Sequence, residues 1–265
     1  MQKIVFNGHY LMYFDTAIAG YWRAMALPTQ QTMASLAGDL FVRKATVEYE
    51  GSARYDDVCE LGVRCARIGR SSMVFSLALL RGETRLVHGE LVYVFADPVT
   101  QTSKPVPAKL REVLDGFEAG EAMLDCRTGR WQQLGSEAAA LRQAVFEAEQ
   151  GVPRAMAYDS ADESALHAVA YNRLGVPVGT GRLQEGAAGR ARIGRLAVMA
   201  ALRSAGVGSA LVRALAHAAR TRGDREVVLS SQASARRFYE RLGFSPRGPA
   251  FEEAGITHQE MVLTL

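Results

Sequence analysis

The sequence predicts a chain of two domains, an N-terminal α+β domain followed by an α/β domain, and three observations lead to this prediction. The chain has 265 residues, which is more than the ~100–200 residues of a typical domain. Its first part reads as one long helix followed by successive strands, a pattern typical of a helix packed on an antiparallel sheet. Beyond residue 122, strands alternate with helices, which predicts a partly parallel central sheet between layers of helices.

The N-terminal domain is expected to begin with a long helix over residues 10–26, which ends before Pro28. Strands rich in Val, Phe, Tyr and Leu are expected at 41–49, 58–68, 73–81 and 86–95. Three prolines between residues 98 and 107 end the sheet, and a short helix follows at 108–117. The small, polar stretch 119–122 is interpreted as a linker, so the domains should span residues 1–118 and 123–265.

The C-terminal domain is expected to open with a strand near Met123. Helices are predicted at 136–150, 206–222 and 233–242. Strands are predicted at 165–173, 178–184, 191–199, 226–230 and 257–265.

Composition excludes several classes of function. Hydrophobic residues make up 48% of the chain and charged residues 22%, as in ordinary globular proteins. A net charge of +3 without a long run of Lys or Arg does not indicate a nucleic-acid partner. No apolar run reaches the ~18 residues of a membrane span and no secretory leader is visible, so no membrane association and a cytoplasmic location are expected. Cys59, Cys65 and Cys126 lack the spacing of a metal site, which predicts buried, reduced thiols and no metal.

The strongest motif is a glycine-containing turn between an apolar strand at 193–199 and a helix. The turn consists of Arg203, Ser204, Ala205, Gly206, Val207, Gly208 and Ser209. A helix start offers free N–H groups and a positive dipole end, which together can hold a pyrophosphate. Gly206 and Gly208 are expected to let phosphate oxygens approach the backbone. Such a pattern alone also occurs where glycines only cap a turn, so further motifs must decide.

A second motif follows at residues 235–244, with the sequence A-R-R-F-Y-E-R-L-G-F. Together the two motifs resemble the GNAT acetyltransferases, and segments 142–152 and 251–261 resemble one bacterial branch of that superfamily. The resemblance covers residues 123–265. It implies the α/β GNAT fold, acetyl-CoA as acyl donor without a metal, and a small-molecule amine as acceptor.

The resemblance also implies a set of site residues. The backbone of Leu196, Ala197 and Val198 would pair with the pantetheine arm, and an amide near Val198 would polarise the thioester carbonyl. Tyr239 would protonate the leaving thiolate, although its ring could simply be packed in the core.

The general base is left open among three residues, Glu252, Glu253 and His258. Each also has a purely structural alternative. The two glutamates could be a solvated pair, and the histidine could be a hydrogen-bonded strand residue.

Residues 3–110 resemble the hot-dog acyl-CoA thioesterases of the hydroxybenzoyl-CoA type. The resemblance rests on segments 5–15, 41–49 and 53–57. It implies a long helix wrapped by an antiparallel sheet, acyl-CoA binding and a homo-oligomer that forms through this domain. The family's first strand and catalytic Asp would fall ahead of Met1, and Asp15 aligns inside the helix. The domain is therefore expected to lack its first strand and efficient thioesterase activity.

The leading hypothesis is an acetyl-CoA-dependent N-acyltransferase for a small amine, fused to a thioesterase-like domain. Two alternatives stay open: an acyl-CoA thioester hydrolase, and a protein that binds acyl-CoA without turnover. No motif identifies the acceptor.

Overall fold

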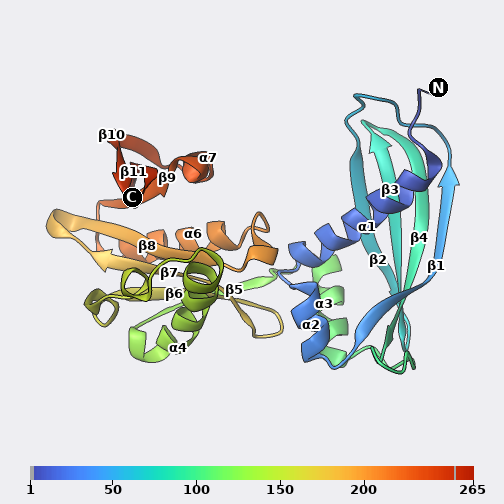
Figure 1. The fold of residues 1–265 in the computed structure, drawn as a ribbon, viewed down its shortest axis with the longest axis horizontal. Coiled ribbons are helices and arrows are strands. Elements are labelled where there is room, and N and C mark those ends of the chain that lie inside the picture. Colours follow the sequence, from blue (N-terminus) through green and yellow to red (C-terminus); the bar gives the residue numbers. More distant parts are fainter. Residues whose placement is uncertain (1–2, 254) are drawn as a thin grey trace. The chain divides into compact units, whose positions relative to one another are not determined.

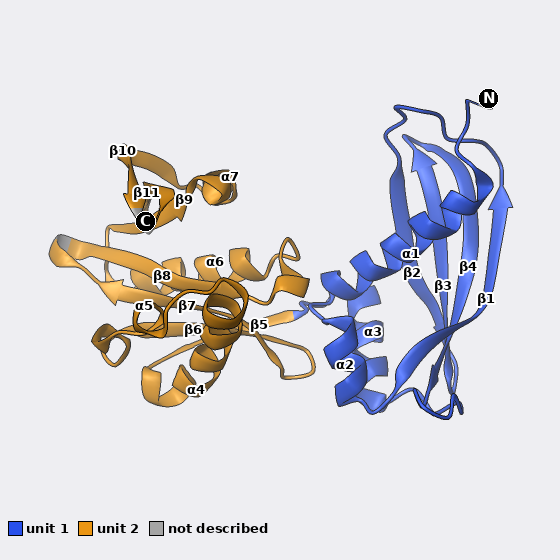
Figure 2. Ribbon diagram, in the orientation of Figure 1, with its two compact units in different colours: residues 1–123 blue, residues 124–265 orange. Residues whose placement is uncertain are grey.

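The computed structural model describes residues 3–253 and 255–265, without the side chains of Ala188 and Glu253. The chain forms two compact units, residues 1–123 and 124–265, coloured separately in Figure 2.

Unit 1 combines three helices with one antiparallel sheet. The sheet has the strand order β1-β4-β3-β2, and every neighbouring pair is antiparallel. The elements are α1 (Asn7–Ala24), α2 (Thr29–Ser35), β1 (Asp39–Tyr49), β2 (Glu60–Ile68), β3 (Ser72–Arg81), β4 (Thr84–Ala96) and α3 (Ala108–Glu118). This arrangement confirms the predicted α+β fold.

Helix α1 packs on the sheet through one apolar stripe. Phe14, Ile18 and Trp22 recur every four residues and are buried, whereas Asp15 is exposed. A Cβ atom at Gly89 of β4 would lie 2.1 Å from the carbonyl oxygen of Thr46 on β1 and 3.0 Å from the Phe14 ring, so glycine there lets both β1 and the helix come close.

Glu118, at the end of α3, joins three elements of unit 1. Its Oε1 accepts hydrogen bonds of 2.6 Å from the hydroxyl of Tyr21 on α1 and from the backbone N–H of Cys65 on β2. Burial and this carboxylate together raise the pKa of Tyr21 well above its ordinary value. The phenol therefore keeps the proton that it donates to Glu118.

Unit 2 is built on one seven-stranded sheet of order β10-β11-β9-β8-β7-β6-β5. Only β8 and β9 pair in parallel. The strands are β5 (Leu124–Gly129), β6 (Leu166–Asn172), β7 (Pro177–Glu185), β8 (Arg190–Val198), β9 (Glu226–Gln232), β10 (Ser245–Glu253) and β11 (Ile256–Thr264). The helices are α4 (Trp131–Arg142), η1 (Gln143–Glu149), α5 (Arg154–Ala157), η2 (Ser160–Asp162), η3 (Ala187–Gly189), η4 (Ala200–Leu202), α6 (Val207–Arg222), η5 (Ala233–Ala235) and α7 (Arg236–Glu240).

Helices α4 and α6 cover opposite faces of this sheet (Figure 1). Helix α4 packs against Val169 and Tyr171 of β6. On the other face, Cβ atoms at Gly179 and Gly181 of β7 would lie 2.9 Å from side chains of α6, so these glycines let α6 pack close to the sheet. The predicted mixed sheet between helices is thus confirmed.

The structure corrects several predicted elements. The helix expected at 136–150 begins at Trp131 and turns into the π-helix η1 at Gln143, and the helix expected at 233–242 is shortened to η5 and α7. Helix α2 and strand β10 were not predicted. Strand β10 contains Pro246 and Pro249, which a sheet accepts at its edge, where β10 lies.

Candidate functional site

Strands β8 and β9 diverge soon after they begin to pair. They pair in parallel at three positions only, from Arg190 with Glu226 to Arg192 with Val228. Beyond these pairs, a cavity of about 410 Å³ is lined by residues 193–196 of β8 and by residues of β9. The edge of β8 that faces β9 therefore has backbone groups without a neighbouring strand, and an extended ligand can pair with them.

A β-bulge bends β8 at this cavity. The register with β7 shifts between the pairs Thr180–Ala197 and Arg182–Gly194, so β8 carries one additional residue here. Arg195 lies in the bulge with φ of +50°, a left-handed conformation that residues with a side chain rarely adopt.

The backbone N–H of Val198 points toward the open edge of β8. The next residue, Met199, donates its N–H to the carbonyl of Val178 on β7 at 3.1 Å. Successive N–H groups of a strand point to opposite sides, so that of Val198 is directed away from β7. A thioester that lies along this edge would meet the donor that sequence reasoning placed near Val198.

The turn after β8 has the geometry of an anion site. Ser204 and Gly206 are left-handed, with φ of +66° and +86°, and α6 begins directly after them. Within the described residues, no backbone partner accepts from the N–H groups of Val207, Gly208 and Ser209, and no side chain caps the helix. Three donors thus point out of the positive end of α6, as a pyrophosphate requires.

The two glycines of the turn differ in what a side chain at each position would meet. A Cβ atom at Gly206 would meet nothing within 4 Å, so its requirement is the positive φ. At Gly208 a Cβ atom would lie 3.3 Å from the ring of Phe238 on α7. The role of both glycines in phosphate access stays a prediction, and the close approach of Phe238 is a further constraint on a side chain at Gly208.

Arg203 begins the turn and forms a two-bonded ion pair. Its Nη1 and Nη2 donate to the carboxylate oxygens of Glu149, the last residue of η1, at 2.6 and 2.7 Å. This ion pair lowers the pKa of Glu149. The turn is thereby tied to the π-helix whose Phe146 lines the cavity.

Tyr239 of α7 lines the same cavity. Its side chain is 9% exposed and lies in edge contacts with the rings of Phe238 and Phe244. Its hydroxyl makes no hydrogen bond within the described part of the chain. Burial raises the pKa of Tyr239 to about 12, so at neutral pH the phenol is protonated and can act as a proton donor.

Of the three candidate bases, the structure places His258 in the wall of the cavity. Its Nδ1 lies 2.8 Å from the carbonyl of Ile256 and donates to it, which leaves Nε2 of the neutral ring with a lone pair. Glu252 is exposed and accepts a hydrogen bond of 2.6 Å from the hydroxyl of Thr257. The side chain of Glu253 lies outside the described residues.

Sequence reasoning missed one part of the cavity wall. This part consists of Phe146, Gln150, Val152 and Met156, which come from η1, the segment after it and α5. The segment 142–152 carried the family resemblance, but nothing in its composition indicated a π-helix, a feature frequent at functional sites. Arg195 was also missed, because a left-handed bulge residue has no sequence signal when it is not glycine.

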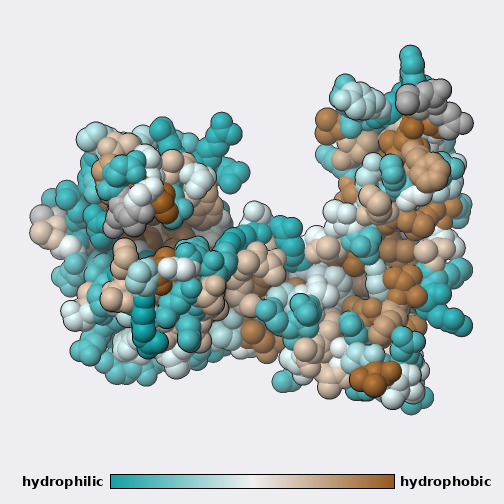
Figure 3. Space-filling model, viewed as in Figure 1, coloured by the Kyte–Doolittle hydropathy of each residue, from teal (hydrophilic) through white to brown (hydrophobic). Residues whose placement is uncertain are grey.

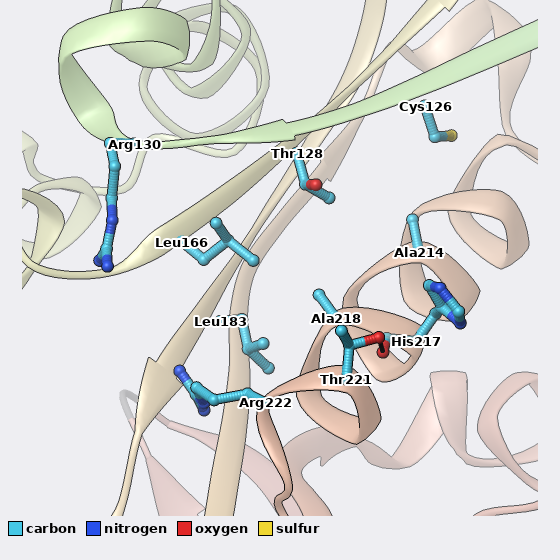
Figure 4. A pocket seen from close by; sticks show the side chains of 10 residues that line it. All are labelled: Cys126, Thr128, Arg130, Leu166, Leu183, Ala214, His217, Ala218, Thr221 and Arg222. Atoms are coloured by element: carbon cyan, nitrogen blue, oxygen red, sulfur yellow. Dashed lines mark hydrogen bonds between the residues drawn. The ribbon is translucent and has the colours of Figure 1, made fainter.

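A second cavity, of about 480 Å³, lies between α6 and the strands β5, β6 and β7 (Figure 4). Leu166 and Leu183 of the strands line it, and Arg130 and Arg222 stand at its rim. Both arginines are engaged, Arg130 with a backbone carbonyl at 2.7 Å and Arg222 with Asp224 at 2.7 Å. This cavity contains no part of the turn and none of the candidate catalytic residues.

Among residues 3–253 and 255–265, no cluster of His, Cys, Asp and Glu could hold a metal ion. Cys59, Cys65 and Cys126 are free thiols, half-buried rather than buried as predicted. Burial raises the pKa of Cys65 to about 11, which keeps this thiol protonated. No helix in the described ranges is both long and apolar enough to span a bilayer.

Comparison with known families identifies two domains. Residues 132–265 match the family model of the acetyltransferase (GNAT) domain, and residues 2–88 match that of the thioesterase superfamily.

Individual relatives agree with this division. The N-acetyltransferase YjcF of Bacillus subtilis, itself uncharacterised, is 34% identical over 123 residues, which are 46% of this chain and 86% of YjcF. The acyl-CoA thioester hydrolase YbgC of Escherichia coli O157:H7 is 27% identical over 108 residues, 40% of this chain and 80% of YbgC. A crystal structure from Lactobacillus plantarum, assigned to the N-acetyltransferases, is 29% identical with a TM-score of 0.51 and covers 54% of this chain and 99% of its own.

Proposed function

The chain belongs to the GNAT acetyltransferase family and is an acyltransferase, and from this premise we propose that it transfers the acetyl group of acetyl-CoA to a small amine. One observation supports the proposal most directly. The unpaired edge of β8, Tyr239 and His258 all line one cavity between two diverging strands.

The donor would bind along β8 and at the start of α6. The pyrophosphate would accept hydrogen bonds from the N–H groups of Val207, Gly208 and Ser209, and Arg203 adds a positive charge to the same turn. The backbone of Leu196, Ala197 and Val198 would pair with the pantetheine arm. The N–H of Val198 would then donate to the thioester oxygen and stabilise the negative charge that develops there.

The reaction needs two proton transfers, and the cavity offers one residue for each. The amine nitrogen attacks the thioester carbon, and Nε2 of His258 takes a proton from this nitrogen. The C–S bond breaks as the tetrahedral intermediate collapses, and Tyr239 gives its proton to the sulfur. The C–N bond of the amide replaces the C–S bond, and the proton balance closes when His258 and Tyr239 exchange a proton with solvent.

Two variants and a panel of amines test this function. Thiol release from acetyl-CoA by the whole protein should require an amine, and His258→Gln should lower the turnover number by about 100-fold, as is typical for loss of a general base. His217→Gln is the matched control, because His217 is an exposed residue of α6 outside this cavity. Thiol release that is independent of amine, or equal turnover in His258→Gln, would contradict the proposal.

For unit 1 we propose acyl-CoA binding and self-association. Exposed apolar side chains of this unit include Leu11 and Met12 on α1, and Val42 and Tyr49 on β1, with 41–61% of each side chain exposed. Figure 3 shows brown side chains on this unit. Such a surface is more apolar than a solvated helix and edge strand need, which supports a protein partner or an acyl chain there.

Sedimentation of the whole protein tests the association. Met12→Glu should shift the protein toward the monomer, because a carboxylate is costly in an apolar interface. Val99→Glu is the control, since Val99 is equally apolar and 89% exposed in the loop after β4. A wild-type protein that is monomeric at all concentrations would contradict self-association.

A further inference from the structure

An ion-pair network lies beside the cavity, on the face of the unit 2 sheet that α4 covers. The carboxylate of Asp162 accepts from Arg142 on α4 at 2.9 Å and from Arg182 on β7 at 2.8 Å. The carboxylate of Asp159 accepts from Arg182 at 2.6 Å and from Arg195 on β8 at 2.8 Å. Two carboxylates thus connect three guanidinium groups in one chain, from the helix to the bulge.

The inner end of this network is withdrawn from water. The side chains of Arg142 and Arg182 are 0% and 3% exposed. His167 accepts from Arg142 at Nδ1 and donates from Nε2 to the backbone carbonyl of Asp162 at 2.8 Å, and burial lowers its pKa, so the ring is neutral. Buried charges keep their places only when each has its partner, so the inner end gives Asp159 a fixed anchor at Arg182.

The outer end of the network is Arg195, the residue of β8 with the left-handed backbone conformation. A left-handed conformation is unfavourable for a residue with a side chain and persists where its surroundings enforce it. Two contacts hold Arg195: Nη2 donates to Asp159, and Nε donates to the carbonyl of Ala157 at 3.2 Å. Both acceptors lie on the segment that follows Met156, a residue of the cavity wall.

We propose that Asp159 is a positioning residue for acyl transfer, which holds Arg195, and through it the bulge, so that the N–H of Val198 points at the thioester carbonyl. This inference rests on the proposed role of Val198. Asp159 itself is absent from the cavity lining and acts through the strand.

The position of the bulge explains why one surface carboxylate has this effect. Arg195 precedes Val198 by three residues, and the strand between them has β7 on one side only. Without the tether, the backbone at Arg195 is free to relax from its left-handed conformation and to rotate the peptides that follow. The turn at residues 203–209 is held separately by α6, so acetyl-CoA should still bind.

Infrared spectroscopy of bound [1-¹³C]acetyl-CoA tests the proposal without an acceptor. A hydrogen bond to the thioester oxygen lowers the carbonyl stretching frequency relative to free acetyl-CoA. Asp159→Asn removes the charge with little change of shape. Arg195→Gly removes the tether and leaves a backbone that adopts positive and negative φ about equally, so nothing holds the bulge in its left-handed conformation. Both should lose most of the frequency shift, and calorimetry should give acetyl-CoA affinities within about twofold of the wild type, because their phosphate contacts are intact.

The pair Asp125 and Arg127 on β5 supplies matched controls. These residues also form an ion pair of 2.8 Å, but on a strand that contributes nothing to this cavity. Asp125→Asn and Arg127→Gly should keep the full shift. With an accepted amine, Asp159→Asn and Arg195→Gly should lower the turnover number by about 10- to 100-fold, as expected for a misplaced reacting group, and leave KM for acetyl-CoA nearly unchanged.

The outcomes separate the two proposals. A frequency shift that persists in folded Asp159→Asn and Arg195→Gly overturns the positioning role. A wild-type complex without any shift overturns the role of the Val198 amide itself. The double variant should behave like either single variant, since both break the same link, and additive losses would show that Asp159 does not act through Arg195.

Discussion

Arg203 and Glu149 form a two-bonded ion pair that joins the turn at the start of α6 to the end of the π-helix η1. The guanidinium that would face the pyrophosphate of acetyl-CoA therefore already has an anionic partner. A carboxylate and a pyrophosphate compete for the same donors, so donor binding and the position of η1 should be linked.

Glu149→Gln is expected to raise the affinity for CoA roughly two- to fivefold, because a neutral amide competes less well for a guanidinium that lies near solvent. Isothermal titration at low and high salt measures the effect, which should shrink as salt screens the charges. Glu163→Gln is the control, since Glu163 is an exposed carboxylate of the same unit. A weaker CoA complex in Glu149→Gln would contradict the competition.

Gly206→Ala should weaken CoA binding, and Gly223→Ala should not. The two glycines flank α6 with similar φ of +86° and +93°, and a Cβ atom at either would meet nothing within 4 Å. Both variants should therefore lose a similar stability of about 1–2 kcal/mol. Gly206 lies beside the free N–H groups at the start of α6, whereas Gly223 lies at its other end. A shifted backbone or an added methyl group should therefore disturb the bound phosphate at Gly206 and not at Gly223.

Melting curves and CoA titrations of the two glycine variants separate strain from ligand contact. Equal stability losses with an affinity loss restricted to Gly206→Ala would support the anion site. Equal CoA affinities in the two variants would show that the turn is only a helix start.

Tyr239→Phe should lower turnover by about 100-fold or more with acetyl-CoA affinity unchanged, because the ring still packs but the acid is lost. With its pKa raised to about 12, Tyr239 keeps its proton at every pH well below that value. The wild-type rate should therefore show no loss from this group up to about pH 10.

Tyr158→Phe is the matched control for the acid. The Tyr158 hydroxyl donates to the carbonyl of Ala139 at 2.9 Å, and the residue does not line the cavity. Equal turnover in Tyr239→Phe and the wild type, measured on any accepted amine, would remove the acid role.

Helices and strands with a clear local sequence pattern could be predicted from the sequence. The long run of apolar and small residues that stops before Pro28 predicted the helix of unit 1. The runs rich in Val, Phe, Tyr and Leu between turn residues predicted its antiparallel sheet. The turn and α6 were equally visible, since glycine and a helix start have strong signals. Strand β10 was missed because its prolines and glycine argue for a loop, and only the edge position beside β11 makes a strand possible.

From the sequence, only those site residues that belong to a recognisable motif could be predicted. Tyr239 belongs to a motif and lines the cavity, whereas the choice among Glu252, Glu253 and His258 depended on which side chain reaches it. The network of Asp159 and Arg195 could not be predicted, because its members come from distant segments and one of them has a left-handed backbone. Long-range pairing of this kind is a property of tertiary structure.

Asp162→Asn should destabilise unit 2 by about 3–5 kcal/mol, because it removes the carboxylate shared by two buried guanidinium groups. Burial acts to raise the pKa of Asp162, but hydrogen bonds from Arg142 and Arg182 outweigh it and hold the pKa below its ordinary value. A carboxylate with a lowered pKa contributes its full stability above the unfolded pKa of about 4 and loses it as the pH falls through the folded pKa.

The stability difference between the wild type and Asp162→Asn should thus be constant from pH 7 to about pH 5 and shrink below about pH 4. Urea unfolding followed by the fluorescence of Trp131, with Trp22 replaced by Phe, reports unit 2 alone, because these are the two tryptophans of the chain and Trp22 belongs to unit 1. Glu163→Gln removes a neighbouring exposed carboxylate and should change stability little at any pH. A difference that is small at pH 7, or that grows as the pH falls, would mean that Asp162 does not hold the two arginines as an ionised group.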